Sequence, residues 1–230
     1  MLAPMDLIGF PPQGPRFAPG RRALLDRPSP PFDFIHGEAM SFIAAPALRD
    51  WVAAAFIQPG GALYNGEHAH LESATLGFLW ANGLNEAAGR RVIGQCELVA
   101  QGVRKTWAGQ RQALLLRRLF GHLPDFVITI DAEQAQSLSD RQFCALIEHE
   151  LCHAGQALDE GGAPRFTKQG RPVFAMRPHD IEEFTSVARR YGAWSPALQA
   201  FSAALASAPE ISDGRLWEAC GTCRGRVRAA

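Results

Sequence analysis

The sequence has no long hydrophobic run. Among its 230 residues, no apolar stretch reaches the roughly 18 residues of a membrane-spanning helix. The N-terminus also lacks the basic segment followed by an apolar one that is typical of a signal peptide. We therefore expect a cytoplasmic protein without a transmembrane segment.

Cysteine is scarce and neither sign of charge is in excess. The five cysteines are an odd number without regular spacing, which argues against the disulfide framework of a small secreted protein. Lys plus Arg and Asp plus Glu number 23 each, so the overall charge gives no reason to expect an acidic membrane or nucleic acid as partner. The apolar share of 47% is typical of a globular protein.

Composition divides the chain into three parts. Residues 1–33 are rich in proline and glycine, as in Pro28-Ser29-Pro30-Pro31, which predicts a flexible N-terminal arm. We expect one compact domain over residues 34–208. Residues 209–230 form an arginine-rich tail with Cys220-Gly221-Thr222-Cys223. This single Cys-x-x-Cys is half of a zinc ribbon, and no second pair exists.

The pattern of apolar residues predicts a mixed α+β fold. Apolar spacing and capping residues predict helices over residues 45–56, 67–80, 107–120, 181–191 and 196–206. β-branched or alternating stretches predict strands over residues 91–100 and 124–131, and residues 161–177 are expected to form a loop.

One further helix, over residues 140–157, has the clearest start signal. Ser139 is a suitable N-cap, and Gln142, three residues later, can reach back to it in a capping box. This helix contains the sequence His149-Glu150-Leu151-Cys152-His153, a His-Glu-x-x-His motif. Since residues four apart lie on one helix face, His149 and His153 can bind a single zinc ion. Glu150 can then take a proton from a zinc-activated water and act as general base and acid.

A catalytic zinc takes three protein ligands and leaves one position for water. Our prediction for the third ligand is His179, which follows His153 after 25 intervening residues. Glu183 is the main alternative because it lies one helical turn after His179, and Glu182 comes next. A residue of this group that is not a ligand could orient one, as could Asp180.

Other polar residues receive simpler interpretations. His68 and His70 are two apart and cannot share a helix face, so we expect them at the surface or at a helix cap. The strand segment Phe126–Ile130 could offer a sheet edge to an extended peptide. Tyr191 or His122 could donate to a developing oxyanion, although a place in the core is the preferred interpretation for Tyr191.

Basic residues gather on and before the predicted helix 107–120. They are Arg104, Lys105, Arg111, Arg117 and Arg118. Such a group could contact phosphate, but a solvated helix face is the commoner arrangement. Support for a nucleic-acid partner is therefore weak.

Several segments, taken in order, resemble the metallopeptidases encoded by phages and prophages, a family of zincin-like proteins. They are Pro124–Asp131, Leu138–Asp140, His149–His153, His179–Phe184 and Arg190–Gly192. The resemblance spans about residues 60–195 and implies a compact zincin-like domain, with a small sheet packed on the motif helix. It also implies His149, His153 and His179 as zinc ligands and Glu150 as the catalytic acid and base. More distantly, the chain is similar to SprT-like proteases, which act near DNA, but it lacks their complete zinc ribbon.

These observations favour a zinc-dependent metallopeptidase that acts on a peptide or protein substrate. The alternative is a non-catalytic phage or prophage interaction protein with a structural zinc site, associated with nucleic acid through its basic residues. An amide hydrolase acting on a cell-wall or small-molecule substrate ranks last, because nothing in the sequence specifies its pocket. The oligomeric state is not indicated.

Overall fold

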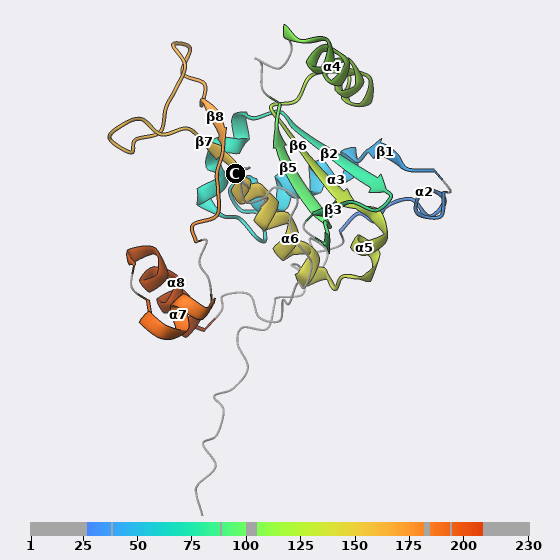
Figure 1. Cartoon of the computed structure of the whole chain (residues 1–230). Helices are drawn as coiled ribbons and strands as arrows, with labels where there is room; N and C mark the ends of the chain where they lie inside the picture. The colour runs from blue at the N-terminus through green and yellow to red at the C-terminus, as the bar shows by residue number, and fades with distance from the viewer. Residues whose placement is uncertain are drawn as a thin grey trace, which may run out of the picture.

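The computed structural model describes residues 27–37, 39–87, 89–99, 105–181, 185–193 and 195–208. Within them the chain combines small sheets with helices (Figure 1), so the predicted α+β fold class is confirmed. The division into an arm, a domain and a tail stays a prediction, because residues 1–26 and 209–230, with Cys220 and Cys223, lie outside the described residues.

The described residues form the following elements. The helices are α2 (Phe32–Ile35), α3 (Pro46–Val52), the π-helical turn η2 (Ala53–Ile57), the 3₁₀ helix η3 (Gly66–Ser73), α4 (Trp107–Phe120), α5 (Ala132–Ser137), α6 (Asp140–His153), α7 (Thr185–Tyr191) and α8 (Pro196–Ala206). The strands are β1 (Ser41–Ala44), β2 (Leu76–Asn82), β3 (Glu86–Ala87), β4 (Arg90–Arg91), β5 (Gly94–Leu98), β6 (Phe126–Asp131), β7 (Ala154–Gln156) and β8 (Phe174–Met176).

The main sheet has four strands in the order β1-β2-β6-β5. β2 and β6 run parallel, and the two outer pairs are antiparallel. β6 is therefore hydrogen-bonded on both sides, and the prediction that Phe126–Ile130 offers an edge is wrong. Among the described strands, β5 forms the edge of the sheet beside β6 (Figure 1).

The predicted helix over residues 67–80 is also wrong. Its first half is the 3₁₀ helix η3, and its second half is the strand β2. β2 is buried on both faces, so its apolar residues do not alternate with polar ones, and a short apolar run of this kind cannot be told from a helix by periodicity. Thr75 fixes the start of β2 beside β6, since its backbone N–H and hydroxyl both donate to Asp125 Oδ2, at 2.8 and 2.7 Å.

Helices cover both faces of the main sheet. On one face, α6 packs through Phe143, Ile147 and Leu151, all with 0% exposure, in the core cluster that also contains the β6 residues Phe126 and Ile128. The other face packs against α4, where Leu116 joins Leu79 of β2 and Val127 of β6. Burial of these side chains is the main stabilising contribution and holds α6 firmly on the sheet.

The start of α6 is the capping box that the sequence predicts. Ser139 Oγ accepts from the backbone N–H of Gln142, and Gln142 Oε1 accepts from the backbone N–H of Ser139. The helix ends at His153 rather than near residue 157, because Ala154 begins β7 and pairs with Met176 of β8. β8 lies within the segment expected to be a loop.

Arg27 holds the junction between α5 and α6. Its guanidinium donates to Asp140 Oδ1 at 3.0 Å and to the carbonyl oxygens of Ala135 and Leu138 at 2.7 and 2.6 Å. It also lies 4.4 Å from the centre of the Phe143 ring. Residue 27, within the predicted arm, is thus in contact with the domain.

Candidate metal centre

Three histidine side chains meet beside the C-terminal end of α6. The Nε2 atom of His149 lies 3.3 Å from Nε2 of His153 and 3.4 Å from Nε2 of His179. His149 and His153 project from the last turns of α6, whereas His179 comes from the segment that follows β8. Among the described residues, this is the one group of three or more metal-ligating side chains whose ligand atoms could hold an ion.

A main-chain contact orients His153. Its Nδ1–H donates to the carbonyl oxygen of Arg177 at 2.8 Å, and Arg177 N–H donates in turn to the carbonyl oxygen of His153 at 3.0 Å. With the ring proton on Nδ1, the lone pair of Nε2 is directed toward the other two imidazoles. This is the arrangement that fixes the tautomer of a metal-binding histidine.

The surroundings keep two of the imidazoles neutral. Burial, together with the neighbouring His153 and His179, lowers the pKa of His149 to about 4. Burial likewise lowers the pKa of His153, although its hydrogen bond to Arg177 acts in the opposite direction. Because only the neutral imidazole can donate a lone pair, the site fits a divalent transition metal at neutral pH.

Glu150 lies on another side of the helix, under the edge strand. Its side chain is fully buried, with 0% exposure. It faces Gly94 of β5 so closely that a Cβ atom at that position would lie 2.7 Å from Glu150 Oε1. The glycine therefore permits the close approach of strand and carboxylate, and the sequence gives no sign of this contact.

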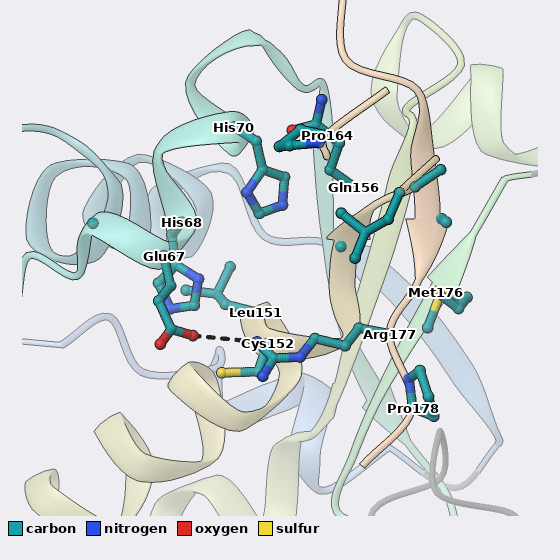
Figure 2. A pocket seen from close by; sticks show the side chains of 15 residues that line it. Glu67, His68, His70, Leu151, Cys152, Gln156, Pro164, Met176, Arg177 and Pro178 are labelled. Carbon is teal, nitrogen blue, oxygen red and sulfur yellow. Dashed lines mark hydrogen bonds and ion pairs between the residues drawn. The ribbon is translucent and has the colours of Figure 1, made fainter. Parts of the chain in front are cut away.

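The C-terminal end of α6 also borders a pocket of about 730 Å³. Figure 2 shows side chains from η3, from the end of α6 and from β7 and β8 around it. Cys152, within the His-Glu-x-x-His motif, is half-buried and lines this pocket.

His68 does not lie at the surface, where it was one of the expected possibilities, and both His68 and His70 contact the region of α6. His68 is 1% exposed, and its Nε2 lies 3.4 Å from Glu148 Oε1. Burial raises the pKa of Glu148, but hydrogen bonds from His68 and Asn65 outweigh this and hold the pKa below its usual value. His70 Nε2–H donates to the carbonyl oxygen of Ala154 at 2.7 Å. These contacts join η3 to α6.

The side chain of Arg177, close to the three histidines, contacts two carboxylates. Its guanidinium donates to Glu67 Oε2 at 3.2 Å and to the two carboxylate oxygens of Asp180 at 3.1 and 3.2 Å. Figure 2 shows the Glu67–Arg177 pair at the pocket. The sequence indicates Asp180 as a residue that could orient a ligand, but it gives no sign of Arg177, whose partners Glu67 and His153 lie in distant segments.

Several predicted residues stand apart from this site. The alternative ligands Glu182 and Glu183 lie outside the described residues. Tyr191 is 65% exposed, so its predicted place in the core is wrong. The basic residues on α4 and just before it are exposed, as expected of a solvated face; they are Lys105, Arg111, Arg117 and Arg118, while Arg104 lies outside the described residues.

A family model described as "Putative phage metallopeptidase" matches residues 49–206. This span is more than half of the chain and contains the three clustered histidines. The chain belongs to this family. Membership implies a metal cofactor and a peptide or protein substrate. Comparison with curated proteins and with solved structures found no match.

In the part of the chain that the structure describes, no helix combines the length and the apolar character that crossing a membrane requires.

Proposed function

We propose that this chain is a zinc-dependent metallopeptidase, with His149, His153 and His179 as zinc ligands and Glu150 as general base and acid. The observation that carries the proposal is the meeting of three imidazole Nε2 atoms at the end of α6, in a chain from a metallopeptidase family. We assign the activity to a domain over residues 34–208.

Three imidazoles suit zinc, because a catalytic zinc site takes three protein ligands and keeps one open position. Zinc held there would supply Lewis acidity and would lower the pKa of a water molecule toward ~7. The protein's part is to present neutral imidazoles. The lowered pKa values of His149 and His153 accomplish this at neutral pH.

Glu150 would move the proton. Its carboxylate, one residue after His149, would accept a proton from the attacking water and pass it to the nitrogen of the leaving amine. The burial of Glu150 beneath Gly94 excludes bulk water from the carboxylate, which strengthens its interaction with a nearby positive charge.

The edge strand β5 suggests where a substrate would lie. A strand at a sheet edge presents backbone N–H and C=O groups that an extended peptide can pair with. β5 has this position among the described strands, and its first residue, Gly94, contacts Glu150. A peptide paired with β5 would thus pass close to the proposed base.

The test compares the wild-type protein with Glu150→Gln in zinc content and in cleavage of casein or a peptide library. We expect about one zinc per chain in both proteins and a rate at least ~100-fold lower in the variant, since acid–base catalysis contributes about 10²–10⁴-fold. Glu160→Gln is the matched control because Glu160 is exposed, in the turn after β7. Stoichiometric zinc with equal rates in all three proteins would exclude proteolysis at this site.

A further inference from the structure

Arg177 joins α6 to the segment that brings His179 to the other two histidines. Arg177 N–H donates to the carbonyl oxygen of His153, and the Arg177 carbonyl oxygen accepts from His153 Nδ1. The first of these bonds continues the ladder between β7 and β8, in which Ala154 pairs with Met176. The main chain of Arg177 is therefore fixed two residues before His179.

The residues that follow Arg177 lead to the His179 ring. His179 is exposed, and Pro178, which precedes it, has no N–H to donate. The ring of His179 has to stay close to His149. The Nε2 atoms of the two rings are 3.4 Å apart. A contact made by side chains on either side of His179 can restrain it further.

The guanidinium of Arg177 makes such a contact. It binds Glu67 of η3 at 3.2 Å and both carboxylate oxygens of Asp180, the residue after His179. η3 is itself tied to α6, because Asn65, its N-cap, donates to Glu148 Oε1 at 2.8 Å. A guanidinium carries several donors in a rigid plane and can bind two carboxylates at once, which a lysine ammonium does less well.

We infer that Arg177 is a positioning residue for the third metal ligand. Its guanidinium, held by Glu67, fixes Asp180 and through it the place of the His179 imidazole. The inference rests on the proposed function, in which His179 binds zinc. It also predicts a change in zinc affinity opposite to the one expected from charge alone. Removal of a positive charge near a cation site would raise zinc affinity by charge alone, whereas loss of positioning lowers it.

The test measures zinc affinity by competition with a chromophoric chelator, for the wild-type chain and for Arg177→Ala, Arg177→Lys and Glu67→Gln. We expect Arg177→Ala to weaken zinc binding about 10–100-fold, the usual cost of losing a group that orients a ligand. Arg177→Lys should recover only part of this loss, and Glu67→Gln should show a smaller loss.

Two further measurements separate positioning from a general structural effect. The absorption spectrum of the cobalt-substituted Arg177→Ala protein should resemble that of His179→Ala. In the His179→Ala background, Arg177→Ala should have no further effect on affinity. Arg171→Ala is the matched control, since Arg171 is exposed, pairs with Asp125 at 3.4 Å and should leave affinity and spectrum unchanged.

The outcomes distinguish the two proposals. If the wild-type chain binds no zinc, or if His179→Ala binds it as tightly as the wild type, the proposed ligand set fails and this inference with it. If the wild type binds zinc through His179 but Arg177→Ala and Glu67→Gln bind it equally well, this inference alone is overturned. An effect of Arg177→Ala that persists in full without His179 would also overturn it.

Discussion

Gly94 brings the backbone of β5 against the carboxylate of Glu150. A methyl group at this position would lie 2.7 Å from Glu150 Oε1 and 2.8 Å from Leu146 Cδ1. Both atoms are ends of side chains, so they can move, but α6 is buried against the sheet and leaves them little room. The size of one residue on the edge strand therefore sets where the proposed base lies.

Gly94→Ala is accordingly expected to displace Glu150 and lower peptidase activity while the histidines keep their metal. Overpacking of this kind costs about 1–3 kcal/mol in the free energy of unfolding. Cleavage rate, zinc content and urea unfolding measure the three effects. Gly66→Ala is the control, because a Cβ there meets only Tyr64 Oη, at 3.7 Å. Equal losses in the two variants would contradict the prediction.

At the residue scale, the sequence predicts those parts of the site that depend on local spacing. His149 and His153 share a helix face because they are four residues apart, and the structure brings His179 to them as expected. The contacts of Gly94 with Glu150 and of His68 with Glu148 could not be predicted. They join segments that are far apart in the chain, and no local pattern records such a contact.

Among the elements, α6 depends on its junction with α5, where Arg27 binds. The Arg27 side chain is only 13% exposed, and its donors satisfy two carbonyl groups and Asp140. Hydrogen bonds that involve a charged group contribute about 1.5–3 kcal/mol each at most. Arg27, far away in the sequence, thus helps to hold in place the helix that carries His149 and His153.

Arg27→Ala should lower the free energy of unfolding by about 1–3 kcal/mol, because the carbonyl groups of Ala135 and Leu138 lose their donors. Chemical denaturation followed by circular dichroism measures this change. In the control, Arg49→Ala, the effect should stay below about 0.5 kcal/mol, since Arg49 pairs with the exposed Asp50. A loss for Arg27→Ala no larger than for Arg49→Ala would show that the junction does not need Arg27.

Helices whose ends are marked by capping residues could be predicted from the sequence, whereas the strand β2, buried on both faces, could not. α4 occupies the predicted residues 107–120, and α6 starts at its capping box. β2 was mistaken for a helix because burial on both faces removes the alternation that marks a strand. β5 was correctly predicted within residues 91–100, but its place at the edge depends on pairing with β6, which comes about 30 residues later.

For the whole molecule, the lowered pKa of His149 links stability to pH. The ring has a pKa of 6.5 in the unfolded chain and about 4 in the folded one. Between these values the unfolded state binds more protons, so stability falls as pH decreases. The contribution is complete above pH 6.5 and is lost on the way to about pH 4. His153, whose pKa is also lowered, acts in the same direction.

The metal-free protein should therefore have a lower urea midpoint at pH 5 than at pH 7. In His149→Gln, which has no ring to protonate at this position, the midpoint should depend less on pH. Unfolding curves of both proteins across this range, with a chelator present, measure the difference. Identical pH dependence in the two proteins would show that His149 makes no such contribution.

The order of the three histidines along the chain determines when the site can form on the ribosome. His149 and His153 are synthesised together, whereas His179 follows after 25 further residues. At about 5–20 residues per second, this delay is roughly 1–5 s. β8 is made only at the end of that interval, so a nascent chain holds an incomplete set of the proposed zinc ligands while it is still among other newly made polypeptides. Late completion of the site would spare those neighbours from cleavage.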